Sequence, residues 1–240
     1  MTPRAGARRA AAAATLALSL LLPPAPARAE GCRLALALGF DISASVDPAE
    51  YAIQKGGLVS ALLNPEVRAA FLGRPGRVWL TVFEWSGWQQ QDMALPWTPI
   101  DTGADLDAVA ARMAAHRRPY DTLSTALGVA MRFGAAQLAA APEPCARRVL
   151  DLSGDGAGNE AEPPGAVRRA PALRGITVNG LAIRGADPDP AAYYRDHVIH
   201  GPGAFVMEAR GGFADFPEVL RRKLLRETAP PMILGAAGRP

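Results

Sequence analysis

The feature that most limits how this chain can fold is a series of apolar, strand-length runs separated by segments of helical periodicity. The run RLALALGF at 33–40 is apolar beyond its first residue, as expected of a strand buried on both faces of a parallel sheet. Leu106, Val109, Ala110 and Met113 have the i, i+3, i+4, i+7 spacing of one helix face. Strands that alternate with helices predict a doubly wound α/β domain with a mostly parallel sheet and helices on both faces.

The remaining elements continue this alternation. We expect strands at 77–85, 92–100, 147–156, 176–183 and 203–209, and helices at 48–63, 123–138, 166–173, 191–199 and 213–227. Asp47, Pro48 and Glu50 form the pattern of a helix start, with Asp47 as the N-cap. Pro96 cannot donate a hydrogen bond to a neighbouring strand, so it indicates an edge strand.

Residues 1–29 have the composition of a secretory signal peptide. A basic start, MTPRAGARR, precedes the apolar run AAAATLALSLLL, and the segment ends in a small-x-small pattern at 27–29. The apolar run is shorter than the roughly 20 residues that cross a bilayer, and prolines follow it. We therefore expect an exported chain, periplasmic or extracellular, without stable membrane insertion. Residues 30–228 are expected to form one domain and residues 229–240 a flexible tail.

The charge balance gives no reason to expect a nucleic-acid partner. The chain has 26 basic and 23 acidic residues, but the segment 1–29 holds four arginines and no acid. Without that segment the chain is close to neutral, whereas nucleic-acid binding proteins usually carry a clear excess of positive charge.

The apolar run at 33–40 ends in three oxygen-bearing side chains on alternate residues: Asp41, Ser43 and Ser45. Carboxylate and hydroxyl oxygens are ligands for hard cations such as Mg²⁺, Mn²⁺ and Ca²⁺. Asp155, in the sequence SGDG, follows another predicted strand, so both segments are expected at the rim where parallel strands end. Serine and aspartate are also common in turns and helix caps, so a plain polar turn is the alternative interpretation.

Three features together resemble the von Willebrand factor type A domain and its metal-ion-dependent adhesion site (MIDAS). They are DxSxS after the first strand, a helix start in mid-chain that contains threonine, and an apolar strand that ends in Gly-Asp-Gly. The segments VFEWSG, RRVLDLSGDG, ITVNGLAI, YYRDHVIHGPGAFV and RRKLLRE also look like an uncharacterised family of secreted bacterial proteins with this domain, known only as a domain of unknown function. The resemblance covers residues 33–227 and implies a Rossmann-like sheet with one antiparallel edge strand.

The resemblance also implies a set of ligands for a divalent cation, with Mg²⁺ the first expectation and Mn²⁺ or Ca²⁺ the others. Ser43 and Ser45 would bind the ion directly, and Asp41 and Asp155 would bind it through water.

The second loop of the site departs from the family pattern. The spacing Thr-x-x-x-x-Ala-Leu, counted back from 126–127, reaches Asp121 where threonine is expected. Either Thr122 takes that role, or Asp121 replaces the threonine and adds negative charge to the site.

Two cysteines, Cys32 and Cys145, each precede a strand whose other end carries a proposed ligand. The resemblance implies that these two strands are parallel neighbours, which would bring the two thiols together. We therefore expect a Cys32–Cys145 disulfide, as is common in exported proteins.

The expected function is that of an exported binding module, in which the cation offers a free coordination position to a carboxylate or similar oxygen of a protein partner. Two alternatives remain: a metal-dependent hydrolase that uses Asp41, Asp155 and a bound water, and a metal-free scaffold. The sequence has no GxGxxG, P-loop or GxSxG motif. None of the three histidines, His116, His197 and His200, is expected beside the predicted site.

Some further polar residues fall near the predicted site. Glu84 ends a predicted strand and could reach the same rim, or serve as a cap or surface residue. Asn159, Glu160 and Glu162 follow the Gly-Asp-Gly turn, where a solvated acidic loop is the favoured interpretation.

Overall fold

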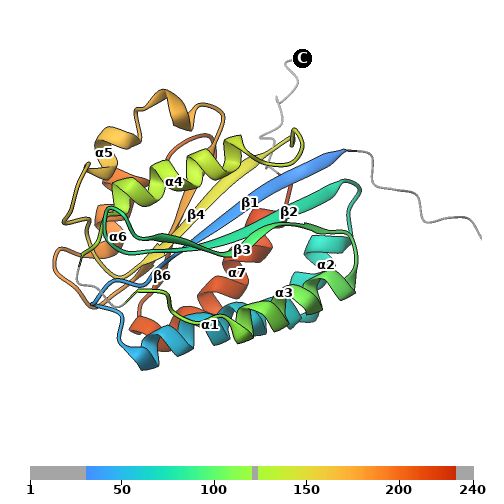
Figure 1. The fold of residues 1–240 in the computed structure, drawn as a ribbon, viewed down its shortest axis with the longest axis horizontal. Helices are drawn as coiled ribbons and strands as arrows, with labels where there is room; N and C mark the ends of the chain where they lie inside the picture. Colours follow the sequence, from blue (N-terminus) through green and yellow to red (C-terminus); the bar gives the residue numbers. More distant parts are fainter. Residues whose placement is uncertain (1–30, 121–123, 231–240) are drawn as a thin grey trace, which may run out of the picture.

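Six strands form one sheet in the computed structural model, which describes residues 31–120 and 124–230 (Figure 1). The strands lie in the order β3-β2-β1-β4-β5-β6. Their bounds are β1 Cys32–Asp41, β2 Arg77–Trp85, β3 Gln91–Ile100, β4 Arg148–Gly154, β5 Thr177–Ile183 and β6 Val206–Ala209. Neighbouring strands pair in parallel, apart from β3, which is antiparallel to β2 at one edge. The predicted α/β fold with one antiparallel edge strand is confirmed.

Helices cover both faces of the sheet, as Figure 1 shows. One face carries α1 (Pro48–Leu63), α2 (Pro65–Leu72), α3 (Gly103–Ala115) and α7 (Phe216–Thr228); the other carries α4 (Leu127–Ala139), α5 (Pro164–Val167) and α6 (Pro190–Tyr193). A π-helix, Tyr194–Val198, continues α6, and 3₁₀ turns occur at Pro171–Leu173 and Gly212–Asp215. Among the described residues, no helix is long and apolar enough to cross a membrane.

The central strand β1 has large side chains on one face and small ones on the other. Leu34, Leu36 and Leu38 are buried in the core under α1 and α7, whereas Ala35 and Ala37 lie in the core under α4. Because successive strand residues point to opposite faces, the alternating Leu-Ala sequence produces this difference directly. The small residues leave room for larger side chains from neighbouring elements on the α4 side.

Several helices differ from the predicted ones. The predicted helix at 166–173 is the four-residue helix α5 followed by a 3₁₀ turn at Pro171–Leu173, and the last helix begins at Phe216 after a 3₁₀ turn. The structure has a separate helix, α2, that was not predicted, although Asn64 before Pro65 was a usable signal: the Asn64 side chain accepts hydrogen bonds from two backbone N–H groups of the first turn. Helix α4 begins at Leu127, later than expected. The predicted helix at 191–199 is a short α-helix followed by a π-helix. The N-cap role of Asp47 is confirmed, because Asp47 and Glu50 form a capping box.

A buried ionic cluster fixes α7 to the sheet. The Lys223 ammonium is fully buried and lies 2.6 Å from the Asp151 carboxylate of β4 and 2.6 Å from the Glu227 carboxylate of its own helix. Asn179 of β5 donates to Glu227 at 3.0 Å. One cation therefore faces two carboxylates away from water, an arrangement that depends on all of its partners being present.

Cys32 at the start of β1 and Cys145 just before β4 form a disulfide between residues that are 113 positions apart in sequence. The two cysteines are also joined by a parallel backbone bridge. The bond therefore holds together the beginnings of the two central strands, as expected.

Replacing both cysteines by serine is expected to lower the free energy of unfolding by about 3–5 kcal/mol, because the unfolded chain regains the freedom of a long loop. Urea unfolding of the oxidised wild type and of the Cys32→Ser/Cys145→Ser variant measures the difference. Equal unfolding midpoints would contradict this expectation, as would free thiols in wild-type protein prepared without reductant.

Candidate functional site

The ends of β1 and β4 bring the predicted ligand residues of two loops together. Asp41 ends β1, and one of its carboxylate oxygens, Oδ1, accepts a hydrogen bond of 2.8 Å from the Ser43 N–H. The hydroxyls of Ser43 and Ser45 are 3.1 Å apart. The Ser45 hydroxyl donates to Asp155 Oδ1 at 2.8 Å. The four side chains thus form one continuous polar chain between the two loops.

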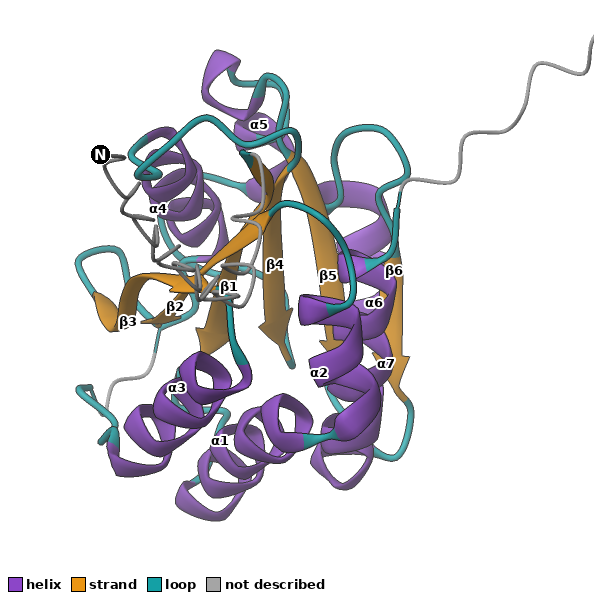
Figure 2. Cartoon of the chain, turned by 90° about the vertical axis from the view of Figure 1, so that its right-hand side faces the viewer, coloured by secondary structure: helices purple, strands orange, loops and turns teal. Residues whose placement is uncertain are grey.

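Parallel pairing explains why these loops meet. Phe40 of β1 and Ser153 of β4 are register partners, so the residues that follow them leave the sheet side by side. Figure 2 shows the arrowheads of β4, β5 and β6 at a common edge of the sheet. We call the edge where β1, β2 and β4 end, at Asp41, Trp85 and Gly154, the carboxyl rim. Ligand sites of open parallel sheets form at this kind of edge.

Burial increases from the outer to the inner part of the cluster. Ser45 is exposed and Asp155 is half-buried, whereas Ser43 and Asp41 are fully buried. The second Asp41 oxygen, Oδ2, has no hydrogen-bond partner among the described residues. A buried carboxylate oxygen without a partner is costly, so this part of the cluster lacks a group that would compensate it.

The surroundings of both carboxylates disfavour their charged forms. Burial first, and then the nearby Asp155, raise the pKa of Asp41 to about 7. Burial also raises the pKa of Asp155. Without a cation, the raised pKa values disfavour ionisation of both carboxyl groups. A divalent cation beside them would favour their ionised forms and lower both pKa values.

Asp121 and Thr122 lie outside the described residues, but the chain on either side of them is bound to the rim. The Arg118 guanidinium donates to the carbonyls of Ile42 and Ser43 at 2.7 and 3.0 Å. On the other side, the Ala126 N–H donates to the Ser86 carbonyl at 2.7 Å. Arg118 therefore connects the second loop directly to the DxSxS segment.

Glu84 is neither a cap nor a surface residue. It is buried on the α1 side of the sheet, where it accepts a hydrogen bond of 2.9 Å from the Tyr51 hydroxyl and lies 3.0 Å from His116 Nε2. Burial raises the pKa of Glu84. Sequence reasoning missed this contact, because Glu84 and His116 come from a strand and a helix end that only the tertiary structure brings together.

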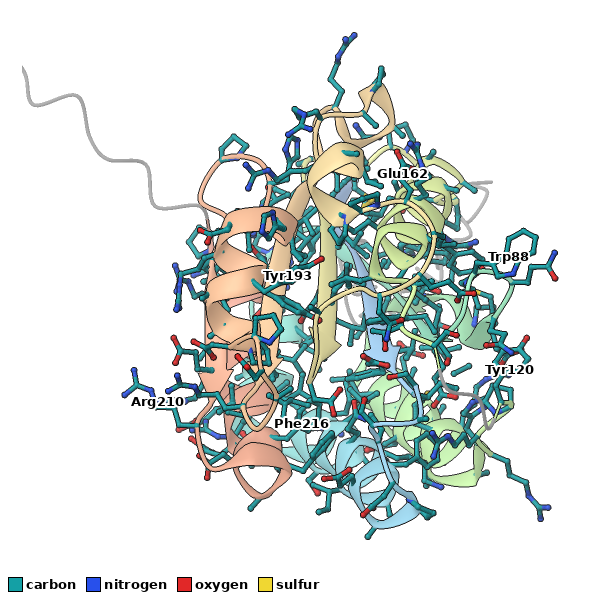
Figure 3. All side chains as sticks on the ribbon, turned by 90° about the vertical axis from the view of Figure 1, so that its left-hand side faces the viewer. Trp88, Tyr120, Glu162, Tyr193, Arg210 and Phe216 are labelled. Atoms are coloured by element: carbon teal, nitrogen blue, oxygen red, sulfur yellow. A yellow bond between two sulfur atoms is a disulfide. The ribbon has the colours of Figure 1, made fainter. Side chains whose placement is uncertain are left out.

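Polar residues after Asp155 bind neighbouring segments of the chain. Asn159 accepts a hydrogen bond from the Thr125 N–H at 2.9 Å, and Glu160 accepts one from the Trp88 N–H at 3.0 Å. Glu162 pairs with Arg132 of α4 at 2.7 Å. These contacts connect the Asp155 loop to the second loop and to the β2–β3 hairpin, whose Trp88 is 58% exposed and projects from the surface in Figure 3.

The remaining histidines have other neighbours. The His197 ring packs against the Tyr193 ring, with the two planes tilted by 53° and the centroids 4.8 Å apart, and His200 forms a backbone bridge with Val178. Within the ranges that the structure describes, no group of three or more His, Cys, Asp or Glu side chains could hold a metal ion. The described oxygen side chains of the cluster are two carboxylates and two serine hydroxyls, which are donors suited to a hard cation.

A family model described as "Protein of unknown function (DUF1194)" matches residues 31–232. A comparison with curated protein sequences finds no match.

Several solved structures share the fold. Proximal thread matrix protein 1 from the mussel byssus aligns with a TM-score of 0.62 and 15% identity, over 82% of this chain and 49% of that protein. Another structure of the mussel protein has a zinc-occupied MIDAS motif. A von Willebrand factor type A protein from Catenulispora acidiphila aligns with a TM-score of 0.56 and 16% identity, over 82% of this chain and 43% of that one.

The pilus adhesin SpaC from Lactobacillus rhamnosus GG aligns with a TM-score of 0.59 and 13% identity, over 83% of this chain and 30% of that one. The chain thus spans half or less of the length of these three proteins. At these identities the likeness establishes the von Willebrand factor A-type fold alone.

The burial of Asp41 predicts a pH dependence of stability in the cation-free protein. Its pKa is about 7 in the folded chain, above the usual 3.8, so the folded state holds a proton that the unfolded state releases between these two values. The protonated Asp41 therefore stabilises the folded state. Its full contribution to the free energy of unfolding is present below pH 4 and is lost as the pH rises to about 7. We expect Asp41→Asn to remove roughly 2–4 kcal/mol of the difference in stability between pH 4 and pH 8.

Urea unfolding at both pH values, in the presence of a chelator, measures this difference. Asp107→Asn, at an exposed aspartate of α3 that pairs with Arg68, is the matched control and should leave the difference close to that of the wild type. An unchanged pH dependence in Asp41→Asn would show that Asp41 ionises normally.

Proposed function

Since the chain belongs to the DUF1194 family of proteins of unknown function and has a von Willebrand factor A-type fold, we propose that it is an exported binding module. The module holds a divalent cation at its carboxyl rim and uses this ion to engage a protein partner. The observation that carries the proposal is the chain of oxygen side chains that links Asp41, Ser43, Ser45 and Asp155 across two loops.

The oxygen atoms of Asp41, Ser43, Ser45 and Asp155 are a ligand set that fits a hard cation. Ser43 and Ser45 supply neutral hydroxyl ligands, and Asp41 and Asp155 supply carboxylates that bind water on the ion. The unpartnered Asp41 Oδ2 and the raised pKa of Asp41 are both consistent with a site that is complete only with positive charge present. Mg²⁺ is the first candidate, with Mn²⁺ and Ca²⁺ as alternatives, and zinc occupies the corresponding motif of the mussel protein.

The second loop is proposed to contribute Asp121 or Thr122. The contacts of Arg118 with the DxSxS segment support a place for this loop beside the site. With Thr122 as a neutral ligand, the ion keeps more of its positive charge and attracts an anionic oxygen more strongly. With Asp121 as the ligand, the ion is bound more tightly and attracts such a partner less.

The proposed partner is a protein that presents a carboxylate or a similar oxygen to the ion. A cation with hydroxyl and water ligands has an exchangeable coordination position, which such an oxygen can take. The exposed Trp88 is on a hairpin that bonds to the Asp155 loop, and exposed tryptophans are common centres of protein interfaces.

Export is supported by the signal-like composition of residues 1–29 and by the disulfide. Disulfides persist in oxidising compartments such as the bacterial periplasm and the extracellular space.

Calorimetric titration of the chelator-treated, disulfide-bonded protein with Mg²⁺ and Mn²⁺ tests the cation site. We expect saturable binding, weakened about 10-fold or more by Ser43→Ala and by Asp155→Asn, since each removes one group that holds the ion. Ser60→Ala on α1 and Glu162→Gln are the matched controls, because both residues lie outside the cluster. No cation-dependent heat with the wild type would refute the cation site.

Capture of proteins from an envelope extract on the immobilised wild-type protein tests the metal-bridged interaction. We expect specifically retained proteins to be released by chelator, and to be absent when Ser43→Ala is immobilised, because both treatments remove the ion. A Ser60→Ala column is the control. Retention of the same proteins with and without chelator would contradict recognition through the cation.

A further inference from the structure

Tyr194 places a hydroxyl group directly beneath the candidate cation site. Its side chain is fully buried, and its hydroxyl has no hydrogen-bond partner among the described residues. A phenylalanine would fill the same space without the cost of burying a polar group. Packing alone therefore does not explain a tyrosine at this position.

Two glycines bring this hydroxyl close to Asp41. The Tyr194 ring lies on Gly180 of β5, where an added Cβ would come within 2.5 Å of the ring. A Cβ added to Gly154 would lie 2.6 Å from the Tyr194 hydroxyl and 2.9 Å from Asp41 Oδ2. Both oxygens therefore converge over the same glycine, and each of them is buried without a partner.

The strand register places these groups in one row. Asp41 pairs with Trp85 on one side, and the register of β1 with β4 sets Asp41 beside Gly154 on the other. The indole N–H of Trp85 is also buried without a partner among the described residues. The register thus sets Trp85 and Gly154 on either side of Asp41 in the sheet, and the Tyr194 hydroxyl lies over Gly154.

We propose that Tyr194 is a positioning residue for the cation site: when the cation is bound, its hydroxyl donates a hydrogen bond to Asp41 Oδ2 while the Ser43 N–H holds Oδ1. This inference rests on the cation site proposed above. Two donors on the two oxygens of one carboxylate fix its plane, so that Asp41 presents a defined face to the water ligands of the ion.

The local backbone supports a functional role for Tyr194. It is the first residue of the π-helix Tyr194–Val198, in which the Ile199 N–H donates to the Tyr194 carbonyl. Single π-helical turns are rare and occur frequently at functional sites.

The test compares Mg²⁺ binding by the wild type, Tyr194→Phe and Tyr193→Phe. Tyr193, labelled in Figure 3, is the adjacent, half-buried tyrosine, and its hydroxyl bonds to the Gly158 backbone, so its replacement makes the same chemical change without removing a group beside Asp41. By calorimetry we expect Tyr194→Phe to bind Mg²⁺ about 10-fold or more weakly, the usual effect of losing a group that orients a metal ligand. Tyr193→Phe should remain within about 2-fold of the wild type, the range expected for a group that does not orient a ligand.

Two further measurements separate positioning from a structural role. In the cation-free protein, the urea midpoint of Tyr194→Phe should equal or exceed that of the wild type, because an unpaired buried hydroxyl has been removed. The near-ultraviolet difference spectrum on Mg²⁺ addition should contain a tyrosine band in the wild type and in Tyr193→Phe, but not in Tyr194→Phe. Gly154→Ala, which inserts a methyl group between the two oxygens, should also weaken Mg²⁺ binding.

The outcomes are distinct. If the wild type binds Mg²⁺ and Tyr194→Phe binds it equally well, the positioning role is wrong and the cation site stands. If Tyr194→Phe lowers the stability of the cation-free protein and the difference spectrum is unchanged, Tyr194 is a structural residue and the inference is also wrong. If the wild type binds no cation, the proposed function fails and this inference fails with it.

Discussion

The parallel pairing of β1 with β4 is the constraint on which the rest of the structure depends. At the start of the pair it places Cys32 beside Cys145, where a disulfide closes. At the end of the pair it sets the DxSxS loop beside the Asp155 loop, where the Ser45 hydroxyl reaches the Asp155 carboxylate. One register therefore determines both the covalent link at one edge of the sheet and the polar cluster at the other.

The same pairing creates an electrostatic cost. Asp41 is fully buried at the end of a strand with a neighbour on each side, and among the described residues its Oδ2 has no hydrogen-bond partner, while Oδ1 accepts from the Ser43 N–H. Elsewhere in the core, buried carboxylates have a cation beside them, as Lys223 beside Asp151 and Glu227 shows. The carboxyl rim has no corresponding cation among the described residues, although Arg118 donates to the backbone carbonyls beside Asp41. This contrast distinguishes a polar cluster that supports the fold from one that is suited to a ligand.

The fold and the outer part of the site could be predicted from the sequence because local patterns encode them. The alternation of Leu and Ala in β1, the Pro-containing edge strand and the Asp47 cap each leave a signal within a few residues. Positions that depend on distant residues were not predicted. Glu84 contacts Tyr51 and His116, which are 33 and 32 residues away in the sequence. Tyr194 approaches Asp41 from a helix near the other end of the chain.

The sequence by itself determined the α/β architecture, the strand that ends in Asp41, Ser43 and Ser45, and the second acid at Asp155. These features follow from hydrophobic periodicity and from short motifs, both of which are patterns among residues close together in the sequence. Only the tertiary structure decided how deeply Asp41 is buried, which of its oxygens lacks a partner, and that Tyr194 lies beneath it. Those properties depend on how helices pack on the sheet and on the space left at Gly154 and Gly180, which local patterns do not specify.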